Sequence, residues 1–173
     1  TAADGQTIVC TTPPLPAAAG AAAVVNVSIS LNAIDFAPSA LRFDFYAAPA
    51  IAHFFPTGGP ARGGSFVQFT GTEFLPDLKG ASEPRCRFGE LATVAASVGT
   101  DAVMACRTPA ADAPSTVALE VSLNAQQFTT AGQTFVTYLE PSVSALSPPQ
   151  GPTGGGTRVV VSGGSFGLPA RTS

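Results

Sequence analysis

Three cysteines carry the most distinctive chemistry in this sequence. Cys86 and Cys106 are about twenty residues apart, and a disulfide between them would stabilise the fold by about 3 kcal/mol on the chain-entropy model. A metal or redox site is the functional alternative, but the sequence has no CxxC motif and its only histidine, His53, is far from both cysteines. Free buried thiols are a third alternative. We predict a disulfide between Cys86 and Cys106.

Patterns that indicate catalysis are absent from the sequence. It has no Gly-x-Ser-x-Gly motif, and no paired carboxylates recur along it. A calcium site would need several clustered acids, and only Glu73 and Asp77 lie near one another. The glycine-rich stretches lack the lysine and the helix of a phosphate-binding loop. We predict no enzyme activity, no cofactor and no metal site.

One modification site is legible in the sequence. Asn26-Val27-Ser28 has the pattern of an N-glycosylation acceptor, and Asn26 lies on the polar face of its predicted strand. The corresponding stretch at Asn124 has lost the acceptor pattern. Together with a cysteine pair, a glycosylation site favours an oxidising compartment outside the cytoplasm.

Apolar and polar residues alternate in two stretches, which predicts strands. Every odd position is apolar in residues 25–32 (VNVSISLN), and residues 117–124 (VALEVSLN) follow the same pattern. A period of two gives a strand one buried and one wet face, as in antiparallel sheets. No comparable window has a helical period, and 18 glycines and 16 prolines are spread along the chain as turn signals. The predicted fold class is all-β.

The sequence repeats itself at a period of about ninety residues. Residues 14–23 form a longer Pro/Ala/Gly loop, so Cys10 and Cys106 match at an offset of 96 rather than 92. The pairs that match at an offset of 92 are Phe36/Phe128, Tyr46/Tyr138, Pro49/Pro141, Pro56/Pro148 and Phe74/Phe166.

This repeat predicts three parts in the chain. Residues 1–48 would be the C-terminal part of one unit, residues 49–140 a complete unit, and residues 141–173 the N-terminal part of a third. A unit of this length suits a small β-sandwich. Because Cys10 matches Cys106, we expect Cys10 to have no partner within the chain.

Charge and hydropathy limit the partners. The net charge is −3, the pI is about 4.9, and no lysine or arginine cluster is present, which argues against a nucleic-acid surface. No apolar run reaches the length of a membrane span. We predict neither a nucleic-acid partner nor membrane insertion in this segment.

Two glycine-rich segments recur along the sequence: 59–65 (GPARGGS) followed by 71–74 (GTEF), and 151–157 (GPTGGGT) followed by 163–166 (GGSF). Between them, Cys86 opens a Cys-x-Phe-Gly motif and Cys106 a Cys-x-Thr-Pro motif. These motifs resemble the IPT/TIG domain, the immunoglobulin-like module of plexin and Met-type receptor ectodomains, although Ser65 stands where that family usually has threonine.

The resemblance implies immunoglobulin-like β-sandwiches in a tandem, extended array. Such an array would act as a structural spacer and protein-interaction module of a large extracellular or cell-surface protein, in adhesion or assembly on a cilium, flagellum or cell wall. Its partners would be neighbouring units of the same chain and other proteins or glycans. One alternative is an accessory carbohydrate-binding module of a secreted protein, which the lack of tryptophan disfavours. Another is an intracellular Rel-like dimerisation domain, which the acidic charge and the cysteine pair disfavour.

Very short linkers join the predicted units, at residues 47–49 and 139–141. Each linker contains a proline, which fixes its own φ and restricts the residue before it. The joints should therefore bend little, and aromatic residues near them should pack there. The predicted junction residues are Tyr46, Pro49, His53, Tyr138 and Pro141.

Overall fold

The protein is all-β in the part of the chain that the computed structural model describes, residues 7–16, 22–74, 83–130 and 132–167. Asp77 lies outside these residues. Within them are twelve strands, which confirms the predicted fold class. The strands are β1 (Ala23–Asn26), β2 (Arg42–Phe45), β3 (Ala50–Phe55), β4 (Gly58–Pro60), β5 (Phe66–Thr72), β6 (Arg85–Phe88), β7 (Ala92–Thr100), β8 (Val103–Arg107), β9 (Thr116–Ser122), β10 (Thr134–Tyr138), β11 (Ser142–Ser147) and β12 (Val160–Gly164).

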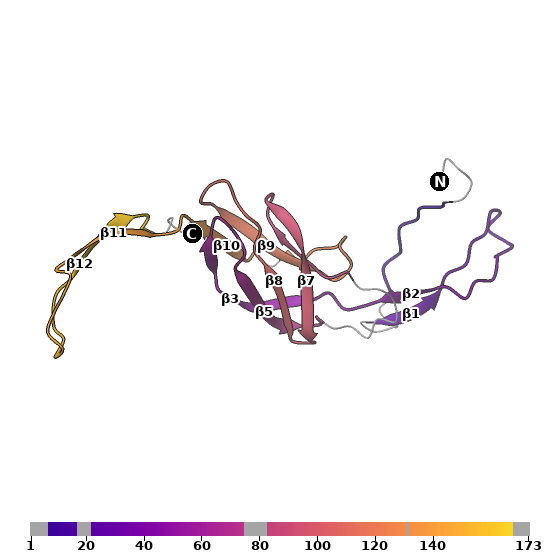
Figure 1. Cartoon of the computed structure of the whole chain (residues 1–173). Coiled ribbons are helices and arrows are strands. Elements are labelled where there is room, and N and C mark those ends of the chain that lie inside the picture. The colour runs from indigo at the N-terminus through magenta and orange to yellow at the C-terminus, as the bar shows by residue number, and fades with distance from the viewer. Residues whose placement is uncertain (1–6, 17–21, 75–82, 131, 168–173) are drawn as a thin grey trace. The chain divides into compact units, whose positions relative to one another are not determined.

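Strands β3 to β10 form an immunoglobulin-like β-sandwich. Their hydrogen-bonded order is β3-β5-β8-β7-β6-β9-β10-β4, and all pairs are antiparallel except β4 with β10. The long strand β7 belongs to both layers, because residues 92–95 pair with β6 and residues 96–100 pair with β8. Figure 1 shows β7 and β8 running beside β9 and β10 in this body.

Alternating side chains of these strands build the core. Val67 and Phe69 of β5 and Leu119 of β9 have no exposed surface, while their polar neighbours in sequence face outward. The rings of Phe88 in β6 and Phe135 in β10 meet edge to face, with centroids 5.5 Å apart. Such pairs add to the stabilisation that burial already gives.

The glycine turn before β5 is held by the Cys-x-Thr-Pro motif. Gly63 and Gly64 have φ of 78° and 83°, which is favourable only for glycine. The buried Thr108 joins this turn to β8, because its Oγ1 accepts a hydrogen bond from the Ser65 amide at 3.0 Å and its own amide donates to the Ser65 carbonyl at 2.9 Å. Gly64 also donates its amide proton to the Thr108 carbonyl, at 2.8 Å.

The remaining strands form two separate two-stranded antiparallel sheets, β1 with β2 and β11 with β12 (Figure 1). By internal contacts the chain divides between Ala47 and Ala48. The predicted strand at residues 25–31 is shorter than expected, since β1 ends at Asn26 and only an isolated bridge at Ile29 follows. The matching strand β9 continues to Ser122 because it has β6 on one side and β10 on the other.

Among the described residues there is no long apolar helix of the kind that crosses a bilayer.

Candidate functional site

The two cysteines of the complete unit meet between the layers. Cys86 in β6 is fully buried, and Cys106 in β8 is 4% exposed. Each lies one strand away from β7, opposite Val94 and Ala96, so in a flat sheet their strands would be about 9–10 Å apart. The thiols instead make a direct hydrogen bond, because the sheet folds over along β7.

This contact lowers the reactivity of Cys86. The hydrogen bond with Cys106, together with burial, raises the pKa of the Cys86 thiol well above its ordinary value. A protonated thiol is a poor nucleophile and a poor metal ligand. Both cysteines are free thiols in this structure, as is the exposed Cys10, so the Cys86–Cys106 disulfide stays a prediction.

An ion pair covers the outward face of β6 and β9. Both Nε and Nη2 of Arg87 contact Oε2 of Glu120, at 2.7 and 2.6 Å, and the Arg87 guanidinium lies 4.2 Å from the ring centroid of Phe128. An open groove of about 470 Å³ lies beside this pair. Glu90 also lines it, so its charged residues carry one more negative than positive charge. The groove is lined by Arg87, Gly89, Glu90, Ala92, Thr93, Ala118 and Glu120.

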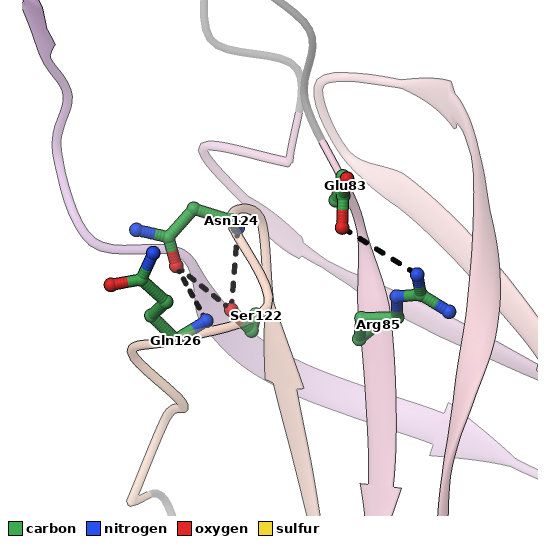
Figure 2. Close-up of polar contacts among 5 residues, drawn as sticks. All are labelled: Glu83, Arg85, Ser122, Asn124 and Gln126. Carbon is green, nitrogen blue, oxygen red and sulfur yellow. Dashed lines mark hydrogen bonds and ion pairs between the residues drawn. The ribbon is translucent and has the colours of Figure 1, made fainter. Parts of the chain in front are cut away.

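A polar turn ends β9 at one rim of the sandwich (Figure 2). The Asn124 Oδ1 accepts hydrogen bonds from the Gln126 amide at 3.0 Å and from the Ser122 hydroxyl at 3.2 Å, which caps the turn around Ala125, whose φ is 60°. Figure 2 also shows the Glu83 carboxylate facing Arg85 at the start of β6, 3.5 Å away. The polar groups of Asn124 and Glu83 are thus engaged with neighbouring residues of the same rim, so we interpret them as structural.

Asn26 lies at the end of β1 and is exposed, on the face opposite to Val25 and Val27. Its modification stays a prediction.

The predicted junction residues differ in their surroundings. Tyr46 and Tyr138 are half-buried, and burial raises the pKa of the Tyr46 hydroxyl. Pro49 is half-buried, while His53, in β3, and Pro141 are exposed. Their packing at the joints between units stays a prediction.

Within the described ranges, no group of three or more histidine, cysteine or acidic side chains is placed to hold a metal ion. Sequence reasoning does not bring Arg87 and Glu120 together, because they are 33 residues apart and meet only through the register of β6 and β9. The signal that could have found them is a pair of opposite charges on the polar faces of two neighbouring strands.

Comparisons with known proteins show which family this fold resembles. The family model of the IPT/TIG domain matches residues 49–137. Among solved structures, the full extracellular region of plexin A4, domains 1 to 10, is similar with a TM-score of 0.48 and 19% identity over 64% of this chain. A second plexin A4 structure, of domains 1 to 8, gives 0.44 and 19% over 57%. This chain spans 9% of either plexin chain. Since the family model covers more than half of the sequence, the chain belongs to the IPT/TIG family.

Proposed function

We propose that this chain is part of a tandem array of IPT/TIG units in a large extracellular or cell-surface protein. The array acts as a structural spacer and a protein-interaction module, and it is not an enzyme. Residues 1–48 are the C-terminal part of one unit, residues 49–140 a complete unit, and residues 141–173 the N-terminal part of another.

One observation carries the proposal: the backbone geometry of the complete unit recurs on both sides of it at the offset of the sequence repeat. Gly155 and Gly156 have φ of 78° and 82°, as Gly63 and Gly64 do, and the Gly155 amide bonds the Pro152 carbonyl at 3.0 Å, as Gly63 bonds Pro60 at 2.9 Å. Strand β11 begins and ends 92 residues after β3.

The other flank repeats the end of the unit in the same way. The Asn32 Oδ1 accepts hydrogen bonds from the amides of Ile34 and Asp35 at 3.0 and 2.9 Å. Asn124 accepts them from Gln126 and Gln127 at 3.0 and 3.1 Å. A turn with a left-handed alanine after a capping asparagine is specific enough to support a common origin of both segments.

The short linkers support the spacer role. Strand β2 ends at Phe45 and β3 begins at Ala50, while β10 ends at Tyr138 and β11 begins at Ser142. Each interval contains a proline, which limits rotation of the chain. Tyr46 and His53 at the first joint, and Tyr138 at the second, stay the junction residues that the sequence predicts.

An interaction role is best supported by the outward face of β6 and β9. The groove beside Arg87 and Glu120 is open to solvent, and it combines charges with the ring of Phe128 below the guanidinium. A protein partner with a basic side chain suits its excess negative charge. The array needs no cofactor for either role.

Small-angle scattering on a stretch of the natural protein that holds two consecutive complete units tests the spacer role. We expect one narrow distribution of shapes with a maximum dimension near twice that of a single unit. A dimension close to one compact globule, or a broad distribution, would reject the stiff array and favour a hinged pair that closes on a ligand.

A further inference from the structure

We propose that Asn26 is the acceptor of an N-linked glycan, which projects from the outward face of its strand. The inference rests on the extracellular location in the proposed function, because the glycosylation machinery works on chains entering the secretory route. It adds a modification site, and it assigns different surfaces to two units of the same array.

The position of Asn26 makes its amide available. Asn26 is exposed at the end of β1, and none of the described residues forms a hydrogen bond with its side chain. Asn32, six residues later, is held instead: its Oδ1 accepts the amide of Ile34 at 3.0 Å and its Nδ2 donates to Asp35 at 2.8 Å. Of these two asparagines, only the one in the acceptor pattern has a free side-chain amide.

A glycan at this position is compatible with a closed sandwich. At the repeat offset of 92, Asn26 corresponds to Ala118 in β9 of the complete unit. Ala118 is exposed even though the next residue, Leu119, has no exposed surface. A bulky group at the position of Ala118 would therefore stand in solvent without displacing the core, and the same holds for Asn26 in its own unit.

The chemistry uses a lipid-pyrophosphate-linked oligosaccharide as donor. The Asn26 Nδ2 forms a bond to C1 of the first sugar and gives up one proton. The bond between C1 and the pyrophosphate oxygen breaks, and the lipid pyrophosphate leaves with the electron pair. The Ser28 hydroxyl, two residues on, completes the acceptor pattern that the transferase recognises.

The glycan would distinguish the outward faces of two units. In the complete unit, Ala118 lines the groove beside Arg87 and Glu120. In the preceding unit the corresponding place carries a glycan, which covers that face. The array would then leave the groove of the complete unit open, while the glycan covers the outward face of β1 in the preceding unit.

The test expresses the whole chain through the secretory route of a eukaryotic host. We expect an intact mass that falls on treatment with peptide N-glycosidase F, with Asn26 converted to aspartate in the peptide map. Asn26→Gln and Ser28→Ala should each abolish the glycan completely, while Ser28→Thr should keep it. An unmodified Asn26 in the secreted chain overturns the proposal.

A matched variant tests the geometric argument, and the natural protein tests the location. Ala118→Asn with Glu120→Thr creates an acceptor in β9, and we expect a second glycan on a chain with an unchanged circular dichroism spectrum. Glu120→Thr alone is the control, because it removes the ion pair with Arg87 without creating an acceptor. Loss of secretion by the double variant but not by Glu120→Thr would contradict the inferred outward position. A glycan on the host-made chain but none on the protein from its source would overturn the modification in nature and count against the extracellular location, with the acceptor itself intact.

Discussion

The complete unit and the segments on either side of it share their local geometry and differ in what covers them. A Cβ added to Gly71 would collide with the carbonyl oxygen of Ala50, and one added to Gly163 would collide in the same way with that of Ser142. Each glycine lies on a strand that pairs with the first strand of its unit, Gly71 in β5 with β3 and Gly163 in β12 with β11. Local sequence is thus sufficient to form the same two-stranded pairing in both places.

Burial does not follow local sequence. Phe135 in β10 has no exposed surface, whereas Phe43, its match in β2, is 41% exposed. Leu119 in β9 is fully buried, and the matching Val27 is 38% exposed. The apolar face is present in both segments, but among the described residues facing strands cover it and exclude water in the complete unit alone.

The glycine turn gives the same contrast at single-atom scale. A Cβ on Gly63 would come within 2.6 Å of the Pro109 backbone, while Gly155, with the same φ of 78°, has no atom within 4 Å of that position. The difference is the Cys-x-Thr-Pro segment. Thr108 of this segment docks on the turn at Gly63, and none of the described residues takes its place at Gly155. The conformation is local, and the tight fit requires strand β8.

The largest expected difference in stability is between substitutions of Phe135 and Phe43. Phe135→Ala should lower the free energy of unfolding by about 3–5 kcal/mol, because it leaves a cavity where Phe88 packs edge to face. Phe43→Ala should lower it by less than about 1 kcal/mol, since it loses mainly its contact with Phe45. Urea unfolding followed by far-ultraviolet circular dichroism measures both. Equal losses of stability would mean that the β2 face is covered in solution, and would contradict the difference in burial between the two segments.

The cysteines give the second effect. In the secreted chain, Cys86 and Cys106 should be joined, and reduction should lower the free energy of unfolding by about 3 kcal/mol. Cys10→Ser should leave the free energy of unfolding unchanged, because Cys10 is exposed and, as the match of Cys106 in the preceding unit, is expected to have no partner in this chain. Once reduced, the folded chain should be alkylated rapidly at Cys10 and slowly at Cys86, whose thiol pKa is raised by its hydrogen bond and burial.

Peptide mapping without reductant decides between the alternatives for this pair. A disulfide that includes Cys10 would invalidate the alignment of the repeat. Two free thiols in protein collected from an oxidising medium would show that the inter-sheet contact is a packed thiol pair and not a covalent link.

The fold class was predictable because alternation and turn residues are local signals. The alternating pattern at residues 117–123 corresponds to β9, at Thr116–Ser122. The same pattern at residues 25–31 predicts too long a strand, since the extent of a strand depends on its neighbours and β1 pairs only with β2. The sequence gives the propensity to form a strand, and pairing with neighbouring strands determines which residues form it.

The candidate site was predictable only in part, for the same reason. The structure brings Cys86 and Cys106 together, and the disulfide between them stays a prediction. The contact of Arg87 with Glu120 and Phe128 requires the pairing register of β6 and β9, which no spacing in the sequence reveals. The sequence does not reveal which residues of distant strands pair with each other, and both the extent of β1 and the Arg87–Glu120 contact depend on that register.

Substitutions of glycine should change stability by an intermediate amount. Gly71→Ala should destabilise the sandwich by about 1–3 kcal/mol, because the new methyl group meets the Ala50 carbonyl and lies 2.8 Å from Cζ of Phe74. Gly99→Ala is the matched control in β7: the nearest atom to its Cβ is the Val103 oxygen at 3.9 Å, so stability should stay constant or rise by about 0.5 kcal/mol.

Gly163→Ala completes that series. It creates the same local collision in β12, but outside the sandwich strands, so the main unfolding transition should not move. Thermal unfolding of the three variants checks the order. A loss for Gly163→Ala as large as that for Gly71→Ala would show that β11 and β12 unfold together with the sandwich.

The smallest expected effect concerns the aromatic ring under Arg87. Phe128→Leu keeps an apolar side chain and the Arg87–Glu120 ion pair, but removes the ring that faces the guanidinium at 4.2 Å. A partly exposed contact of this kind contributes about 0.5–1 kcal/mol, so the urea midpoint should fall slightly at constant m-value. Phe36→Leu is the matched control, because Phe36 is 58% exposed and no described cation lies over its ring. It should leave the midpoint unchanged. If both variants shift the midpoint equally, the ring stabilises its own turn after the capping asparagine, and the guanidinium contact contributes nothing specific to the complete unit.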